Sequence, residues 1–153
     1  MSLTYQNLAG DGVLADIHIA FAELVSRLDG GQGPLVGLAA ALVSEQLARG
    51  HVCLDLRKVS KISFVSQADG KDRAYDDWPD SESWGSALRC SDLVTLAGLL
   101  SDAEDVQTPL VLDEESCRLY LGRYWHYQRE LAAGIVKRLS KAGTFSDDEI
   151  DRN

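Results

Sequence analysis

The sequence has few cysteines and no long apolar run. Its three cysteines, Cys53, Cys90 and Cys117, are widely spaced and include no Cys-x-x-Cys pair, which argues against a zinc site and against a disulfide framework. No stretch approaches the roughly 18 apolar residues that a membrane-spanning helix needs. The N-terminus also lacks a basic start followed by an apolar core, so nothing predicts export. We therefore expect a cytoplasmic protein with free cysteines.

Positive charge is also scarce. The chain has 24 acidic and 15 basic residues, a formal net charge of −9. A protein that binds nucleic acid by itself gains most of its affinity from lysines and arginines that contact phosphates. In this sequence the cations are scattered and form no basic stripe, as at Arg57, Lys58, Lys61, Lys71 and Arg73. We therefore expect no direct DNA binding by this chain alone.

Catalytic sequence motifs are missing as well. The chain has no Gly-x-x-x-x-Gly-Lys-Ser/Thr loop, no Gly-x-Gly-x-x-Gly after a strand and no Gly-x-Ser-x-Gly elbow. Its three histidines fall in different predicted elements. His51, Cys53 and Asp55 share one face of a predicted strand, but strand alternation alone places any three such residues together. The residues by themselves favour a binding or scaffolding domain over a catalyst.

The length of 153 residues suits one domain with a real core, and 45% hydrophobic and 25% charged residues are typical of a globular protein. Helical spacing of apolar residues predicts a first helix from Leu14 to Leu28, which Asp29-Gly30-Gly31 stops. A second helix is predicted from Pro34 to Gly50, because proline suits the first turn and glycine the end. Its small residues from Gly37 to Ala41 would let a neighbouring helix approach closely.

The middle of the chain alternates between short elements and a loop. Residues Gly50 to Leu56 predict a short strand, and the polar, turn-rich stretch from Ser66 to Asp80 predicts an exposed loop. A third helical region is predicted from Ser81 or Ser83 to Leu99-Leu100, in which Ser91-Asp92 could introduce a break. The acidic run Asp102 to Asp105 then leads into the next strands.

The region from Thr108 to Leu139 predicts a β-hairpin followed by an amphipathic helix. Apolar residues first alternate, at Leu110 and Leu112 and again at Leu119 and Leu121. The period then changes to 3.6, and one helical face carries Tyr124, Gln128, Leu131, Ile135 and Leu139. We expect this face to pack, and the helix to end near Ala142-Gly143.

These elements predict a single α+β domain over residues 1–143. It is mainly helical, with a small antiparallel sheet made of the Gly50–Leu56 strand and the Leu110–Leu121 hairpin. Residues 144–153 are predicted as an acidic linker towards a further domain. We assign no structural role to Met1-Ser2-Leu3.

Three segments of the chain form an ordered set: Leu38 to Ser44 with Gly50 to Leu56, Trp84 to Val94, and Thr108 to Leu112 with Arg118 to Trp125. Together they resemble the N-terminal domain of RecD, the alpha subunit of exodeoxyribonuclease V (the RecBCD helicase–nuclease). The ordered set is more specific than each motif alone, and Gly-His-Val-Cys-Leu is its most specific phrase. Gln128, where an acidic residue is expected, is a minor departure.

This resemblance implies an ATP-dependent helicase subunit that moves 5′ to 3′ on single-stranded DNA in double-strand break repair and recombination. ATP and Mg would bind to a helicase motor domain that follows this chain, and DNA would be contacted through that motor. The chain itself is expected to be a non-catalytic assembly domain, docking the motor onto a RecC-like subunit in a complex that also holds a RecB-like subunit.

Exposed aromatic residues and arginine are the side chains that most often anchor a protein interface. In this chain the candidates for the partner interface are Tyr75, Trp78, Arg123, Tyr124 and Trp125. Each of the aromatic residues could instead pack on the domain's own core, and Arg123 could pair with a nearby carboxylate.

Two other functional classes stay open from the sequence. A free-standing acidic adaptor or inhibitor could use its negative charge to occupy the basic DNA channel of a nuclease or helicase. A small cytosolic hydrolase could assemble its catalytic residues in space, and its activity would then depend on His51 or Asp55.

Overall fold

The computed structural model describes residues 2–30, 33–100 and 106–150, with side chains up to residue 142. Its central element is an apolar helix, α3 (Pro34–Ala48). Pro34 begins it, and the predicted helix is confirmed. Most of its residues are buried, because other elements pack around it on several sides. Gly37 lies so close to Ser26 and the Tyr5 ring that a Cβ atom there would force one of them to shift.

Helix α2 (Asp16–Leu28) packs along α3 and confirms the first predicted helix. A shorter helix, α1 (Tyr5–Gly10), precedes it and was not predicted. Thr4 caps α1, because its hydroxyl accepts from the Asn7 backbone N–H while the Asn7 side chain accepts from the Thr4 N–H. Leu3 is buried in the core, so the expectation that the first three residues have no structural role is wrong for Leu3.

Four short strands form a mixed sheet in the order β1-β6-β5-β4. The hairpin of β5 and β6 confirms the prediction, and Leu112 pairs with Leu119. Strand β1 joins the hairpin antiparallel, as predicted, and Leu54 lies opposite Leu119. It is only two residues long, however, so the predicted strand from Gly50 to Leu56 is too long. The strands are β1 (Leu54–Asp55), β4 (Val94–Leu96), β5 (Leu110–Asp113) and β6 (Arg118–Leu121).

The third predicted helix is only partly correct. Helix α4 (Ser81–Arg89) ends at Arg89, and the chain continues as strand β4 and a 3-10 turn, η2 (Ala97–Leu99). β4 pairs in parallel with β5, so the sheet is mixed rather than antiparallel. The apolar residues from Leu93 to Leu100 have helical spacing, but pairing with β5 overrides that local pattern.

Between β1 and α4 along the chain, the backbone forms a small separate ribbon. After the turn η1 (Val59–Lys61), strand β2 (Phe64–Val65) pairs antiparallel with β3 (Asp72–Arg73). The predicted exposed loop therefore contains one short strand. Gly70 stands at its tip with a φ of +68°, a conformation that favours glycine.

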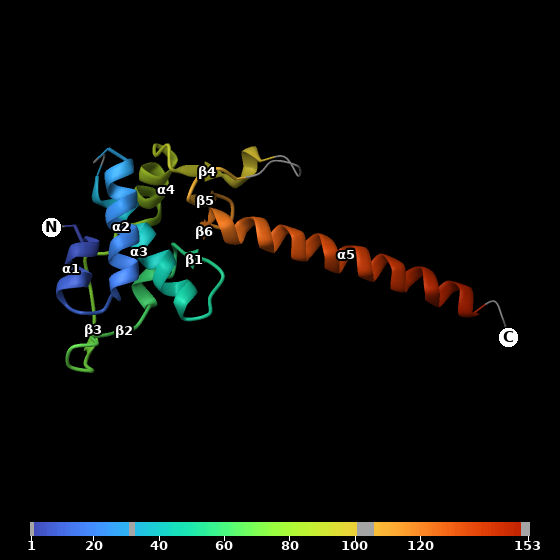
Figure 1. Cartoon of the computed structure of the whole chain (residues 1–153), viewed down its shortest axis with the longest axis horizontal. Helices are drawn as coiled ribbons and strands as arrows, with labels where there is room; N and C mark the ends of the chain where they lie inside the picture. The colour runs from blue at the N-terminus through green and yellow to red at the C-terminus, as the bar shows by residue number, and fades with distance from the viewer. Residues whose placement is uncertain (1, 31–32, 101–105, 151–153) are drawn as a thin grey trace.

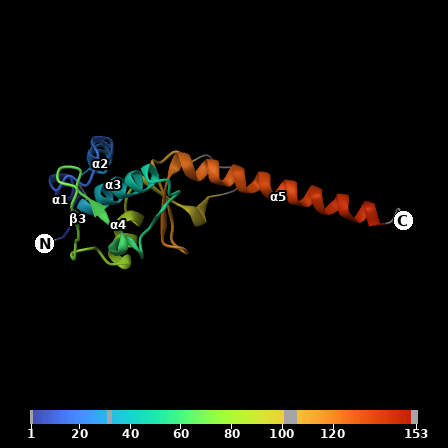
Figure 2. The same cartoon turned by 90° about the horizontal axis from the view of Figure 1, so that it is seen from below.

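The last helix, α5 (Gly122–Ile150), differs most from expectation. It continues to Ile150 instead of ending near Ala142-Gly143. Both views show it projecting from the sheet, with most of its length away from the rest of the domain (Figures 1 and 2). Leu131, Ile135 and Leu139 are exposed, so the expectation that this face packs within the domain is wrong.

The mainly helical α+β class is confirmed, and the core is built around α3 from residues of α1, α2, α4 and the sheet. Within the described ranges, none of the helices combines the length and the apolar character needed to cross a bilayer. The predicted acidic run at residues 102–105 lies outside the described residues. Residues 31–32 of the predicted helix stop and the last three residues of the predicted linker lie outside them as well.

His18 makes the stability of this core depend on pH. It is buried on α2, and its Nδ1 lies 2.7 Å from Oγ of Ser44 on α3. Burial lowers the pKa of His18, and the charge of Glu45 opposes that shift only partly. Below pH of about 6.5 the unfolded chain takes up a proton at His18 that the folded chain resists. We therefore expect stability to fall as the pH drops from about 6.5 towards the lowered pKa of the folded state.

Urea unfolding of the chain at pH 7.5 and pH 5.5 measures this effect. In His18→Asn, which cannot take up the proton, the loss of stability between the two pH values should be smaller than in the parent chain. An equal loss in both proteins would show that other groups cause it.

Candidate partner-binding site

The first candidate site is a cluster of three aromatic rings at the small ribbon. Phe64 on β2 is fully buried, and Tyr75 and Trp78 lie partly buried around it. The ring centroids are 6.0 Å apart for Phe64 and Tyr75, 5.9 Å for Phe64 and Trp78, and 6.1 Å for Tyr75 and Trp78. We call these three residues the ribbon cluster. Its geometry brings together two residues that the sequence proposed as separate anchors.

A hydrogen bond fixes Tyr75 to the turn after α1. Its hydroxyl donates to Oδ2 of Asp11 over 2.9 Å. Burial, together with this hydrogen bond and the negative charge of Asp11, raises the pKa of Tyr75 well above its ordinary value. Tyr75 therefore stays neutral across the physiological pH range and remains a hydrogen-bond donor.

The outer side of the ribbon cluster borders a surface cavity of about 480 Å³. Tyr75 and Trp78 line it together with Leu56 and Pro79, and Arg57 and Asp76 bring charge to it. The surface of this cavity is mainly polar, so a partner that bound here would meet two aromatic rings beside charged and hydroxyl groups. Tyr75 and Trp78 thus pack on the domain's own core on one side and remain accessible on the other, and their role as partner anchors stays a prediction.

The other three predicted residues lie elsewhere, at the start of α5. Trp125 packs against Tyr120 on β6, with ring centroids 4.8 Å apart, and its Nε1 is buried without an acceptor among the described residues. Tyr124 is exposed and makes an edge contact with Tyr127. Arg123 is exposed as well. The five predicted residues therefore form two separate groups rather than one surface.

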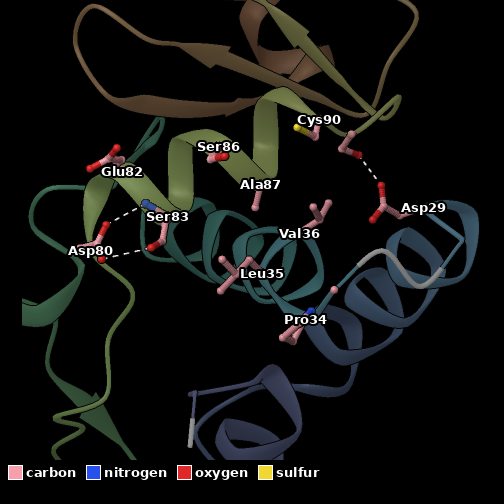
Figure 3. Close-up of a pocket in the computed structure, with 12 residues that line it drawn as sticks. Asp29, Pro34, Leu35, Val36, Asp80, Glu82, Ser83, Ser86, Ala87 and Cys90 are labelled. Atoms are coloured by element: carbon pink, nitrogen blue, oxygen red, sulfur yellow. Dashed lines mark hydrogen bonds between the residues drawn. The ribbon is translucent and has the colours of Figure 1, made fainter.

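A third feature was not predicted. A surface cavity of about 590 Å³ lies between the start of α3 and helix α4 (Figure 3). Leu35, Val36 and Ala87 give it an apolar floor, while Asp29 and Asp80 lie on opposite sides. Among its described lining residues none is a lysine, arginine or histidine, so its polar groups are mainly acceptors and hydroxyls.

Most of these polar groups already have structural partners. Asp80 caps α4, because its Oδ1 accepts from the Ser83 backbone N–H over 2.7 Å. Ser91 Oγ donates to Oδ1 of Asp29 over 2.5 Å, whereas Oδ2 of Asp29 is buried and accepts from no described residue. In the sequence Asp29 marks only a helix end, so no local signal revealed this cavity.

The polar face of the Gly50–Leu56 segment lacks an activated nucleophile. His51, Cys53 and Asp55 line one cavity of about 380 Å³ together with Arg118. Burial raises the pKa of the Cys53 thiol, although Arg118 opposes the shift. A protonated thiol is a poor nucleophile. Across the described residues, no group of three or more His, Cys, Asp or Glu side chains is placed to hold a metal ion.

Comparison with known proteins identifies the family. The family described as RecBCD enzyme subunit RecD, N-terminal domain, matches residues 10–120. The RecBCD enzyme subunit RecD of Mycobacterium tuberculosis, in strains CDC 1551 / Oshkosh and ATCC 25618 / H37Rv, is 27% identical over 136 residues, which are 88% of this chain and 20% of the relative. The same subunit of Mycolicibacterium smegmatis is 29% identical over 126 residues, which are 82% of this chain and 19% of the relative.

The chain thus spans about a fifth of the length of the curated relatives it matches. The match to the family includes α2, α3, α4 and nearly all of the sheet, and it stops just before α5. Since this covers most of the sequence, the chain belongs to the family of RecD N-terminal domains.

Proposed function

We propose that this chain is the assembly domain of an exodeoxyribonuclease V alpha subunit and that it docks the subunit's motor onto a RecC-like subunit. The observation that carries this proposal is the ribbon cluster, with Tyr75 and Trp78 at a surface cavity in a domain whose relatives are named as RecBCD subunits. Large rings held rigidly at a cavity lose little conformational entropy on binding, which makes them effective anchors.

The rest of the intact subunit supplies the chemistry in this proposal. The chain has no phosphate-binding loop in its sequence, so ATP and Mg would bind to the motor that follows. DNA would be held by that motor, and a RecB-like subunit would belong to the same cytoplasmic complex. This domain would contribute attachment without catalysis. Its role in DNA repair and recombination would therefore be to keep the helicase motor in the complex.

The docking surface can be tested by measuring the affinity of the chain for its RecC-like subunit. Trp78→Ala should weaken binding by about 30-fold or more, which corresponds to about 2 kcal/mol, because it removes a partly buried ring at the cavity. Tyr75→Phe should have a smaller effect, since the ring stays and only the hydrogen bond to Asp11 is lost.

Tyr127→Ala is the matched control, because Tyr127 is an exposed aromatic residue on α5 that lies outside the ribbon cluster. Circular dichroism should first establish that each variant is folded. An unchanged affinity in a folded Trp78→Ala protein would show that the ribbon cluster is not the docking surface.

One observation favours the acidic adaptor as a second candidate. Residues 1–121 contain nine basic and nineteen acidic residues, a net charge of −10, which suits a protein that occupies a basic channel. The two candidates differ in the native reading frame. A Gly-x-x-x-x-Gly-Lys-Ser/Thr loop soon after residue 153 would support the helicase subunit, and a stop codon there would support the adaptor.

A further inference from the structure

Helix α5 carries an exposed apolar stripe. Tyr124, Leu131, Ile135 and Leu139 recur at intervals of seven, four and four residues, which places them on one face of a helix. Their exposed fractions are 45%, 66%, 49% and 67%. We call these four residues the α5 stripe. Gln128 lies on the same face between Tyr124 and Leu131, so the apolar surface is continuous only from Leu131 to Leu139. An exposed apolar surface of this kind is unusual on a monomer and marks a site where another surface packs.

No described part of the chain covers the α5 stripe. Helix α5 contacts β5 and β6, the two strands that lead to it, and no other element to a comparable extent among the described residues. Beyond its first turns the helix extends away from the domain in both views (Figures 1 and 2). The face that carries the stripe is therefore available to a surface that comes from outside this structure.

The part of α5 up to Ala142 has a charge opposite to that of the domain, while the whole helix to Ile150 has a net charge of +1. Its described side chains, from Gly122 to Ala142, include five cations and one anion, a net charge of +4, whereas residues 1–121 carry −10. The α5 stripe therefore fits an apolar groove with an acidic rim, the arrangement by which amphipathic helices dock on proteins. The cations are Arg123, Arg129, Lys137, Arg138 and Lys141.

Two other occupants fit less well. Nucleic acid would be attracted by the cations, but it would leave the aliphatic side chains of Leu131, Ile135 and Leu139 in water. A second copy of the chain would bring together two proteins of net charge −9. In addition, Arg138 lies at the edge of the stripe, where a symmetric parallel helix pair would place two arginines close together.

We propose that the α5 stripe packs against the part of the subunit that follows this domain in the longer members of the family. The family match is to an N-terminal domain and stops at residue 120, and α5 begins two residues later. The relatives are about five times as long as the part matched by this chain. Helix α5 therefore leads from the domain towards the remainder of the subunit.

A direct covalent connection also favours this occupant energetically. Once α5 is joined to the following part, their association is intramolecular, and the effective concentration can reach the millimolar range. The remainder of the subunit thus outcompetes separate proteins of similar intrinsic affinity. This inference rests on the proposed function in one respect, that the chain continues into a longer subunit. It concerns the α5 stripe and not the ribbon cluster, so the crosslink from position 135 and the affinity for a RecC-like subunit test the two proposals separately.

The test uses the full-length subunit expressed from the native reading frame, without the other subunits. The photo-crosslinking residue benzoylphenylalanine replaces Ile135 in one protein and Ala133 in a control. Ala133 is also exposed, but it lies on the opposite side of the helix. Irradiation should link position 135 to a residue beyond 153 within the same molecule, as peptide mapping of the monomer band shows. Position 133 should give at least fivefold less of this product.

Several results would overturn the proposal. One is a band of twice the mass, which indicates a second copy. Another is a crosslink that forms only after a RecC-like subunit or DNA is added. The third is an equal yield of the crosslinked product from positions 135 and 133. A reading frame that ends soon after Asn153 would overturn the proposal too.

If the crosslinker at position 135 prevents folding, hydrogen exchange of the unmodified proteins replaces the crosslinking experiment. Amides of residues 128–142 should then exchange at least tenfold more slowly in the full-length subunit than in the 153-residue chain, and equal rates would contradict the proposal.

Discussion

Trp84→Ala is expected to lower the free energy of unfolding of this chain by about 3–5 kcal/mol. Trp84 is fully buried on α4 and belongs to the main core, where α4 packs against α3 and β4. Alanine would leave a cavity that these elements could fill only by moving together. Since a domain of this size is stable by only about 5–15 kcal/mol, the loss would remove a large fraction of its stability. Urea unfolding followed by circular dichroism measures it.

Trp84→Phe is the matched control for this prediction. The Nε1 of Trp84 is buried and has no acceptor among the described residues, so the native side chain already carries the cost of an unpaired donor. Phenylalanine removes that donor and keeps much of the ring volume. We therefore expect Trp84→Phe to cost far less than Trp84→Ala. Equal losses, or a loss below about 1 kcal/mol for alanine, would contradict the buried position of this ring.

The elements that the sequence predicted well are those whose signals are local. Pro34 and Gly50 flank an apolar run that could only be a buried helix, and α3 follows it closely. The alternating leucines of the hairpin likewise set its register, since a shift by one residue would turn Leu112 and Leu119 out of the core. In both regions the local pattern and the tertiary packing demand the same structure.

Strand β4 shows where this agreement fails. Its residues Val94 to Leu96 have no strand pattern of their own, because a strand of three residues is too short to show alternation. They are extended because the Val94–Leu110 and Leu96–Leu112 pairs join them to β5. A parallel neighbour that is more than ten residues away leaves no periodic signal in the local sequence.

Helix α5 and the ribbon cluster show a second limit of prediction from the sequence. The period of 3.6 correctly predicted a helix with one apolar face, but periodicity does not say what covers that face. For Tyr75 and Trp78 the sequence offered both a core and an interface position. The structure packs each ring against the core and leaves part of it at a surface cavity, so the interface role stays a prediction. What the sequence did not reveal was Phe64, which organises the pair from a strand eleven residues earlier than Tyr75.

Phe64→Ala should have an effect as large as that of Trp84→Ala, about 3–5 kcal/mol in the free energy of unfolding. Phe64 is fully buried and contacts both other rings of the ribbon cluster. The centroid of its ring lies 5.6 Å from the guanidinium carbon of Arg49. Alanine would remove the ring that supports Tyr75 and Trp78 from the inside. Urea unfolding again gives the loss, and a value below about 1 kcal/mol would contradict the prediction.

Phe64→Leu then separates the support of the core from the support of the docking surface. Leucine keeps an apolar side chain at this position, so most of the stability should remain. The edge and stacking contacts with Tyr75 and Trp78 would be lost, however, and the two rings would no longer be held rigidly at the cavity. If these rings dock the RecC-like subunit, a folded Phe64→Leu protein should bind it several-fold more weakly. An unchanged affinity, alongside a weakened Trp78→Ala, would show that Trp78 alone anchors the partner and that Phe64 serves only the core.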